Sequence, residues 1–253
     1  MVQVSSLASS SSGNAYFLEA NKSCFLIDAG IGIRDLDEKL HLLGKRINAI
    51  DAVFITHEHI DHVRAVPQLA RLDVPIFMSN GTYNALGLKL RNFVPICAGQ
   101  EIAIKDIRVK AFEKFHDSAE PLGFSILCGE THACFATDLG KCSSSVKEEI
   151  GKSNFLLLES NHDIEMLKSG PYPIHLKRRI LSSLGHLSNE DSALAVLENA
   201  NSRLEHIMLA HLSEINNRPE IALLVFRTLL NERCDLKPKI IVCPKDKIST
   251  VRL

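Results

Sequence analysis

The sequence has no excess of charge of either sign. Its 253 residues carry 29 Lys and Arg against 30 Asp and Glu, which gives a net charge of −1. A chain so nearly neutral lacks the strong basic field of proteins that coat nucleic acids or lie on membrane surfaces. Any contact with phosphate groups must therefore depend on a local group of cations.

Long apolar segments and paired cysteines are also absent. Runs such as Phe155 to Leu158 are far shorter than the roughly 20 residues that span a bilayer, so we expect no membrane association. The first residues, MVQVSSLASSSSGN, contain no basic stretch followed by an apolar one, which predicts no secretion signal. The 7 Cys form no Cys-x-x-Cys pair, and an odd number favours a reducing compartment over a disulfide framework. We therefore expect a cytoplasmic protein.

The rest of the composition is that of an ordinary globular chain, with 45% apolar and 23% charged residues. Neither an internal repeat nor a long linker divides it, so we expect a single domain over residues 1–253. Short apolar segments alternate with segments of helical periodicity, and this pattern favours an α/β protein whose sheets are covered by helices.

The expected strands are Val2 to Leu7, Ala15 to Glu19, Cys24 to Ile27, Ala52 to Thr56, Ile76 to Ser79, Ile107 to Phe112, Phe124 to Cys128, Ala133 to Thr137, Phe155 to Glu159, His206 to Ala210 and Lys239 to Val242. The expected helices are Ile33 to Leu43, Val63 to Leu72, Thr82 to Arg91, Val146 to Ile150, Ser192 to Ala200 and Pro219 to Asn231. Ser188 and Asp191 resemble a capping box, so a helix should begin just after Ser188.

The strongest chemical signal is the segment HEHIDH, residues 57–62, directly after the apolar strand that ends at Thr56. Active sites of α/β sheets lie at the carboxyl ends of strands. Alternate residues of an extended segment face the same way, so His57 and His59 can converge on one metal ion. Asp61 and His62 then turn towards a second position as a helix begins. A chance match of this pattern is expected on the order of once per thousand such chains.

This segment resembles the HxHxDH signature of the metallo-β-lactamase superfamily, and other parts of the chain agree with that resemblance. The matching segments are Ile27–Gly30, Phe115–Asp117, Ala136–Gly140 and Leu209–Ser213. More narrowly, Ser6–Asn14, Glu159–Asp163, Gly170–Pro173 and Gly185–Asp191 resemble the YycJ/WalJ-type branch, whose members are regarded as acting on nucleic acids, with a reported DNA exonuclease activity among them.

The resemblance implies a four-layer αβ/βα sandwich with two central mixed sheets. It also implies two divalent metal ions, one held by His57, His59 and His116, the other by Asp61, His62 and His211, with Asp138 bridging both. Imidazole and carboxylate ligands suit zinc, with manganese or iron as alternatives. Such a pair of ions can hold a bridging hydroxide and stabilise a leaving oxygen. The ordinary alternatives are a loop histidine for His116 and a turn-capping residue for Asp138.

Several further residues are expected to support or contact the reaction. We expect Asp28 to fix the HEHIDH turn by accepting hydrogen bonds from its backbone or imidazoles, and Glu159 to orient a histidine, with His186 as the candidate. His186, beside the helix start at Ser188, would by resemblance contact the scissile phosphate or protonate the leaving group, although a histidine that only packs the loop is the alternative. Asp61 and His186 are thus the expected catalytic residues.

The expected substrate-binding residues are Asn14, His186, Ser188, Lys177 and Arg178. Lys177 and Arg178 belong to the basic segment 171–179, which could hold a phosphate backbone or simply form a solvated helix face.

Three functional hypotheses follow. The leading one is a dinuclear metal-dependent phosphodiesterase that acts on nucleic acid, a nuclease or exonuclease on DNA. A second is a small-molecule hydrolase of the same fold that cleaves a thioester, lactone or cyclic nucleotide, because the same metal site serves acyl and phosphoryl chemistry. A third is a regulatory metal-binding protein, which seven ligand side chains argue against because unmetallated imidazoles and carboxylates are costly to bury.

Overall fold

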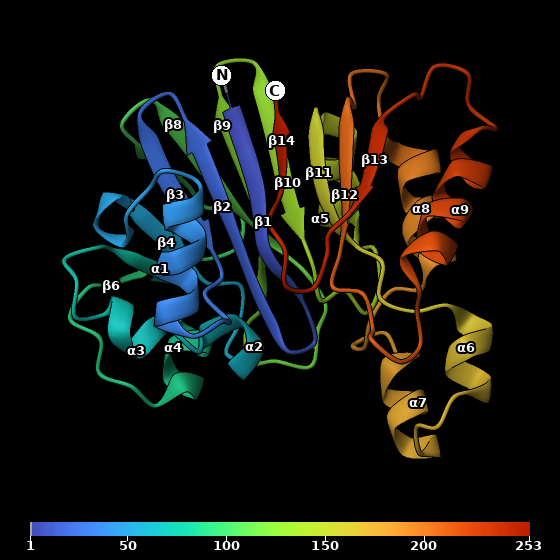
Figure 1. Cartoon of the computed structure of the whole chain (residues 1–253), viewed down its shortest axis with the longest axis horizontal. Helices are drawn as coiled ribbons and strands as arrows, with labels where there is room; N and C mark the ends of the chain where they lie inside the picture. Colours follow the sequence, from blue (N-terminus) through green and yellow to red (C-terminus); the bar gives the residue numbers. More distant parts are fainter. Residues whose placement is uncertain (1) are drawn as a thin grey trace. The chain divides into compact units, whose positions relative to one another are not determined.

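The structure is a computed structural model that describes residues 2–253. Its strands form two seven-stranded sheets, and each sheet mixes parallel and antiparallel pairs (Figure 1). The α/β class with two central mixed sheets, expected from the sequence, is confirmed. No helix among the described residues has the length and apolarity needed to cross a membrane.

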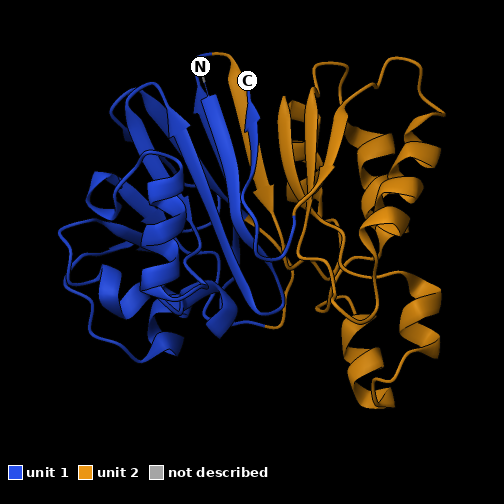
Figure 2. Ribbon diagram, viewed as in Figure 1, with its two compact units in different colours: residues 1–112, 118–129, 244–253 blue, residues 113–117, 130–243 orange. Residues whose placement is uncertain are grey.

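The chain divides into two compact units (Figure 2). The first unit takes the residues up to 112 together with 118–129 and 244–253, and the second takes 113–117 and 130–243. A single domain over residues 1–253 stays a prediction.

The first sheet lies wholly in the first unit, in the order β14-β1-β2-β3-β4-β5-β6. Its strands are β1 (Val2–Ser10), β2 (Gly13–Ala20), β3 (Ser23–Ile27), β4 (Ala52–Phe54), β5 (Ile76–Met78), β6 (Phe93–Pro95) and β14 (Ser249–Arg252). From β3 to β6 the pairs are parallel. The segments that follow β3 and β4 therefore leave the sheet at the same edge.

Apolar residues of this sheet and of the helices beside it form one buried cluster in the first unit. Leu36 and Leu40 of α1 (Ile33–Leu42) and Leu69 of α3 (Val66–Leu69) pack with strand residues such as Phe17 and Val53. Burial of side chains of this size contributes roughly 1.5–3 kcal/mol each. The remaining helical elements of this unit are η1 (Ile47–Ala49), α2 (Ile60–Val63) and α4 (Asn80–Leu86).

The second sheet has the order β13-β12-β11-β10-β9-β8-β7. Its strands β7 (Glu101–Ile104), β8 (Ile107–Glu113) and β9 (Leu122–Cys128) fall in the first unit except for Glu113. There the ring of Phe124 in β9 packs against that of Phe54 in β4, with centroids 5.2 Å apart. The first unit therefore contains strands of both sheets packed face to face.

The second unit contains four parallel strands: β10 (Thr131–Ala136), β11 (Phe155–Glu159), β12 (His206–Ala210) and β13 (Lys239–Val242). All five residues of β11 are buried, as is usual for a strand covered on both faces. The helices of this unit are α5 (Ser144–Lys152), α6 (Ile164–Ser169), α7 (Ile174–Ile180), α8 (Asn189–Asn199) and α9 (Pro219–Leu230).

The predicted helix from Val63 to Leu72 is wrong as a single element. Two short helices, α2 and α3, occupy this region, and Pro67 lies in the first turn of α3, where its missing N–H is tolerated. The predicted helix from Thr82 to Arg91 ends instead at Leu86, because Gly87 adopts a left-handed conformation (φ 63°) that caps it. The sequence patterns also missed β6, β7, β14, α6 and α7.

Candidate metal centre

In the first unit, the buried carboxylate of Asp28 organises the turn that follows β4. It accepts hydrogen bonds from the Thr56 amide (2.8 Å) and the Thr56 hydroxyl (2.9 Å). The Nδ1 atom of His62 lies 2.7 Å from the same carboxylate, and both side chains are fully buried. Asp28 thus orients the ring of His62, and that His62 ligates a metal stays a prediction.

These contacts fix which ring nitrogen carries the proton. The Thr56 hydroxyl has one hydrogen and donates it to Asp28, so it must accept the Nδ1–H of His57, 2.9 Å away. The Nδ1 of His62 donates to a carboxylate that can only accept. In both rings Nε2 is therefore the atom with a lone pair suited to ligate a metal.

The donor atoms of residues 57–62 have spacings that fit shared metal ions. The Nε2 of His57 lies 3.1 Å from the Nδ1 of His59, and the Nε2 of His62 lies 3.3 Å from Oδ2 of Asp61. Two donors on a tetrahedral zinc ion with bonds of 2.0–2.1 Å are about 3.3 Å apart. Glu58, the intervening residue, instead accepts the amide of Ala119. The residues present therefore fit a divalent metal.

Asn14 and Gly30 hold this turn from the β1–β2 hairpin and the β3 end. The buried Asn14 amide donates to Oδ2 of Asp61 (3.1 Å) and lies 3.2 Å from Nε2 of His62. A side chain at Gly30 would place its Cβ 1.6 Å from the Asp61 carbonyl oxygen. Only glycine permits this approach. Asn14 therefore contacts two predicted metal ligands, Asp61 and His62, whereas the sequence suggested that it binds substrate.

In the second unit, the fully buried carboxylate of Glu159, at the end of β11, holds two histidines at once. Its Oε1 lies 2.8 Å from Nδ1 of His186 and 2.9 Å from Nδ1 of His211. Its Oε2 accepts the amides of Leu139 and Leu187. Burial alone would raise the pKa of Glu159, but the charge and hydrogen bond of His186 and the hydrogen bond of His211 outweigh it and lower the pKa to about 2.

Asp138 completes this group. Its Oδ1 lies 3.5 Å from Nδ1 of His211, and donor atoms of Asp138, Glu159, His186 and His211 all lie within 4.8 Å of one another. Since Glu159 takes the Nδ1–H of both histidines, their Nε2 atoms are the ones suited to a metal or substrate. Asp138, Glu159 and His211 are almost completely buried, whereas the His186 side chain is 17% exposed.

His116, the remaining predicted ligand, also belongs to the second unit. Its Nδ1 donates to the carbonyl of Gly185 (3.1 Å). Burial, the largest cause, lowers the pKa of His116 to about 4, with Lys114 and His186 acting in the same direction and Asp138 opposing them. The ring is therefore neutral at pH 7, the state that a metal ligand requires.

Three predicted site residues have left-handed backbones although none is glycine. Asp28, Asp138 and His211 have φ values of 58°, 57° and 57° and follow β3, β10 and β12 respectively. This conformation costs roughly 1–2 kcal/mol for an L-residue. The Asn161 amide donates to the His211 carbonyl (2.9 Å) and helps to hold it. Such strain at strand ends is typical of functional positions.

The other predicted substrate-binding residues have mixed surroundings. Ser188 caps α8, because its buried hydroxyl accepts the Asp191 amide (3.0 Å). The predicted cap is thus confirmed. On α7, Lys177 donates to the Lys168 carbonyl (2.7 Å), and Arg178 is exposed.

The structure also shows an ion pair that the sequence reasoning missed. The guanidinium of Arg179 pairs with Asp117, whose Oδ1 is 3.3 Å from Nε2 of His116. The basic segment 171–179 indicated cations near the site, but the sequence could not show which of them is paired, because that depends on how α7 packs.

Comparisons with known proteins agree with this chemistry. The family model described as "Beta-lactamase superfamily domain" matches residues 24–211. The exodeoxyribonuclease YycJ of Bacillus anthracis is 35% identical over 233 residues, 90% of this chain and 88% of that protein. The exodeoxyribonuclease WalJ of Streptococcus pneumoniae is 35% identical over 224 residues, 85% of this chain and 83% of that protein.

Among solved structures, the metallo-β-lactamase-fold protein YhfI of Bacillus subtilis superposes with a TM-score of 0.75 and 14% identity, over 99% of each chain. At that identity the match concerns the fold, which agrees with the predicted sandwich of two mixed sheets. The family model and the two relatives also establish the family of this chain. This chain belongs to the beta-lactamase superfamily, in the branch that contains YycJ and WalJ, and is a metal-dependent hydrolase.

Proposed function

We propose that this chain is a nuclease that hydrolyses phosphodiester bonds at the ends of DNA, with two divalent metal ions held by His57, His59, Asp61, His62, His116, Asp138 and His211. YycJ and WalJ, relatives at 35% identity over most of both chains, are named exodeoxyribonucleases. The observation that carries the proposal furthest is the pair of histidines on Glu159: His211 is buried as a ligand would be, while His186 is partly exposed.

When bound, the metal ions would supply a hydroxide nucleophile at neutral pH and stabilise the leaving oxygen. The chain's own residues hold the substrate. Nδ1 of His186 is bound to Glu159, so its Nε2 is the atom available to a phosphate oxygen. His186 lies just before the α8 N-terminus, where backbone dipoles favour an anion. With protons on both ring nitrogens, His186 donates from Nε2 to the phosphate and passes that proton to the leaving oxygen, while its Nδ1–H stays on Glu159.

The cations of α7 extend this proposal. Arg178 is exposed and can contact the backbone of a bound strand without reading its sequence. Lys177 is partly committed to the Lys168 carbonyl, so Arg178 is the better candidate of the two. The α7 segment leads directly to His186, whose amide donates to the Ile180 carbonyl (2.9 Å).

We propose zinc as the native metal, with manganese and iron as alternatives, because imidazole and carboxylate donors suit all three. The 7 thiols are all free, and this supports a reducing compartment such as the cytoplasm.

A substrate panel tests the reaction. Purified protein with Zn²⁺ or Mn²⁺ is incubated with end-labelled single- and double-stranded DNA and RNA, and separately with generic ester and phosphodiester substrates. We expect metal-dependent release of nucleotides from DNA ends. Cleavage of the ester alone would show a small-molecule hydrolase and overturn the proposal.

Variants of His186 and Asp61 test the assigned roles. His186→Ala should lower DNA cleavage about 10²–10⁴-fold, the usual contribution of a general acid, with metal content unchanged. Asp61→Ala should lower both activity and metal content. His175→Ala, an exposed histidine of α7, is the control and should change neither. Loss of metal in His186→Ala would mean that His186 is a ligand instead.

A further inference from the structure

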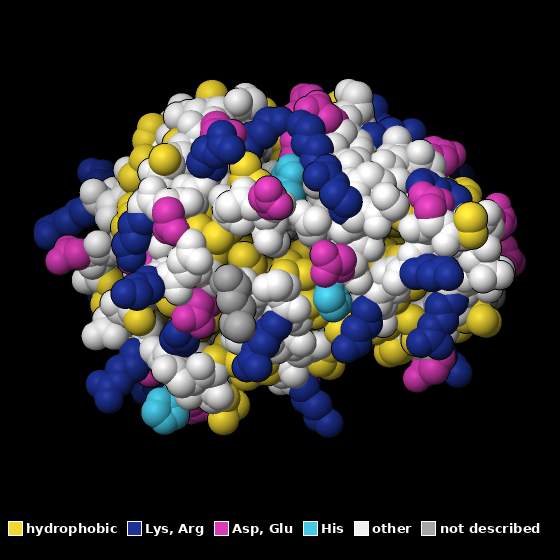
Figure 3. All heavy atoms as spheres, turned by 90° about the horizontal axis from the view of Figure 1, so that it is seen from above, with side chains coloured by type: hydrophobic (Ala, Val, Ile, Leu, Met, Phe, Trp, Pro, Cys, Tyr) yellow, Lys and Arg dark blue, Asp and Glu magenta, His cyan; other side chains and the backbone are white. Residues whose placement is uncertain are grey.

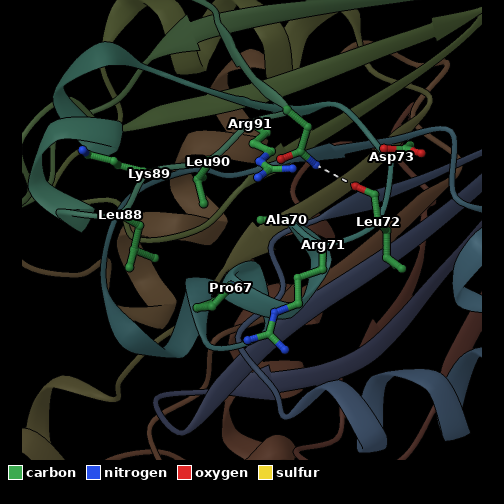
Figure 4. A pocket seen from close by; sticks show the side chains of 10 residues that line it. Pro67, Ala70, Arg71, Leu72, Asp73, Leu88, Lys89, Leu90 and Arg91 are labelled. Atoms are coloured by element: carbon green, nitrogen blue, oxygen red, sulfur yellow. Dashed lines mark hydrogen bonds between the residues drawn. The ribbon is translucent and has the colours of Figure 1, made fainter.

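A hollow of about 560 Å³ lies in the first unit beside α3 and the segment before β6. Its cations, Arg71, Lys89 and Arg91, point to different parts of it, with apolar side chains between them (Figure 4). Groups separated in this way do not converge on one ligand, as the polar groups of a binding pocket do. Polar side chains converge instead inside the β1–β2 hairpin, where a buried hydrogen-bond network reaches the metal-binding turn.

The Asn14 amide lies at the centre of this network, and its neighbours fix its orientation. The Ser10 N–H, which can only donate, lies 3.2 Å from Oδ1 of Asn14. The Ser10 carbonyl (2.9 Å) and Oδ2 of the Asp61 carboxylate (3.1 Å), which can only accept, lie beside Nδ2. A rotated amide would place donor against donor and acceptor against acceptor at these contacts. The nitrogen of Asn14 therefore faces Asp61.

This nitrogen carries two hydrogens for a larger number of acceptors. Its shortest contact is with the Ser10 carbonyl, which takes one hydrogen. The second hydrogen points at the metal-binding turn, where Oδ2 of Asp61 lies 3.1 Å away, Nε2 of His62 3.2 Å and the Asp61 carbonyl 3.5 Å. The carboxylate takes it, because a charged acceptor makes the stronger hydrogen bond. Nε2 of His62 thus keeps its lone pair, 3.3 Å from Oδ2 of Asp61.

Tyr16 supports the Asn14 amide at its oxygen. The Tyr16 hydroxyl donates its single hydrogen to Oδ1 of Asn14 (3.2 Å), so its oxygen accepts from the Ser9 hydroxyl, 3.0 Å away. Ser9, Asn14 and Tyr16 are all buried, and a hydrogen bond inside a protein is electrostatically stronger than one in water. The donations therefore run in one direction, from Ser9 through Tyr16 and Asn14 to Asp61.

The network reaches one of the two predicted metal positions. Asp61 and His62 lie within hydrogen-bond distance of Asn14. His57, a predicted ligand of the other ion, is held by the Thr56 hydroxyl instead (2.9 Å). The two positions thus receive their support from different side chains.

We propose that Asn14 and Tyr16 are positioning residues for the metal ion of Asp61 and His62. Tyr16 fixes the Asn14 amide, and the amide holds Oδ2 of Asp61 beside Nε2 of His62, so that both donor atoms are in place before the ion binds. The inference rests on the ligand set of the proposed function and adds that the two ions have separate support. Loss of the network should weaken one ion and leave the other in place.

Zinc titration of the full chain tests this proposal. Zn²⁺ is titrated into the metal-free protein against a chromophoric chelator, which gives the affinity of each bound ion. We expect Asn14→Ala to weaken one of the two ions about 10–100-fold, the usual effect of removing a residue that orients a ligand. Tyr16→Phe, which leaves the Asn14 side chain in place, should weaken the same ion about tenfold, at the lower end of that range.

Asn84→Ala and Tyr83→Phe are the matched controls in the same unit. Asn84 is an exposed residue of α4, and the ring of Tyr83 stacks on that of Phe93 with centroids 4.0 Å apart. Both variants should bind two ions as tightly as the wild type. Urea unfolding of each metal-free variant separates positioning from a structural role, since a structural role lowers stability without changing the metal affinity of the folded chain.

Two results would overturn the inference: wild-type affinity for both ions in the folded variants, or an equal loss at both positions, because the network would then support the whole site. Should Asn14→Ala not fold, Tyr16→Phe decides alone. A wild type that binds no Zn²⁺ would refute the proposed ligand set and the inference with it, so the two failures are distinguishable.

Discussion

At the scale of single residues, buried carboxylates fix the orientation and the Nδ1 proton of three histidines of the candidate site. Asp28 sets the ring of His62, and Glu159 sets those of His186 and His211. Each acceptor is fully buried, so its negative charge is little screened by solvent. Proton placement at Nδ1 leaves Nε2 of His62 and His211, two predicted ligands, with the lone pair that a metal requires, and leaves Nε2 of His186 to face the substrate.

The sequence predicted these residues better than their partners. HEHIDH is a local pattern, so its spacing alone indicated a metal site. Glu159 was expected to orient a histidine, with His186 suggested, but its contact with His211 depends on the parallel pairing of β11 with β12, which places Glu159 opposite Ala210. Pairing between distant strands cannot be read from local periodicity.

A substitution of Glu159 tests whether this carboxylate orients both rings. Glu159→Gln keeps the size of the side chain but removes the charge, and we expect metal affinity to fall about 10–100-fold. Activity at saturating metal should fall as well, because His186 loses its charged acceptor and the remaining amide oxygen cannot replace both carboxylate oxygens. Metal titration and initial rates measure the two effects separately.

The matched control is Glu165→Gln on α6, an exposed carboxylate whose side chain is 82% accessible. It should leave both quantities unchanged. Metal affinity equal to wild type in Glu159→Gln would contradict the orienting role.

At the scale of elements, the carboxyl ends of strands carry the chemistry. Asp28 follows β3, Asp138 follows β10 and His211 follows β12, each in a left-handed conformation. The sequence patterns placed these strands well because each is a short apolar run between turn residues. The patterns failed where a proline or a glycine interrupts a helical periodicity. Pro67 lies in the first turn of the separate helix α3, and Gly87 ends α4.

The close approach at Gly30 yields a prediction for the β3 end. Gly30→Ala forces the Asp61 backbone to move, because the new Cβ would lie 1.6 Å from its carbonyl oxygen. We expect a destabilisation above about 3 kcal/mol and loss of metal binding. Urea unfolding and metal analysis of the purified variant provide the measurements.

Gly32→Ala, two residues away, is the control, since nothing lies within 4 Å of a Cβ there and its φ is −61°. It should be neutral or slightly stabilising. Equal stability of the two variants would show that the contact between Gly30 and Asp61 does not constrain the turn.

At the scale of the whole molecule, the positive and negative charges almost cancel, with 29 Lys and Arg against 30 Asp and Glu. On the face shown in Figure 3, Lys and Arg side chains are interspersed with Asp and Glu. This agrees with the net charge of −1 and limits tight non-specific binding of nucleic acid, which normally needs many phosphate contacts. A substrate held mainly at the metal ions and at the α7 cations suits such a surface.

Metal removal tests the molecule as a whole. A ligand that binds only the folded state stabilises it by about 2.7 kcal/mol at a hundred times its Kd. For a chain of this size chelation should then lower the Tm by about 5–10 °C. Differential scanning calorimetry before and after dialysis against a chelator, with metal content checked, measures the shift.

The His57→Ala variant gives this measurement its control. It lacks one predicted ligand, so chelation should change its Tm less than that of the wild type, while re-addition of Zn²⁺ should restore only the wild-type protein fully. A Tm that does not move when metal loss has been verified would mean that the imidazoles and carboxylates of the turn and strand ends are stable without ions. Their hydrogen bonds to Thr56, Asp28 and Glu159 would then suffice to hold them.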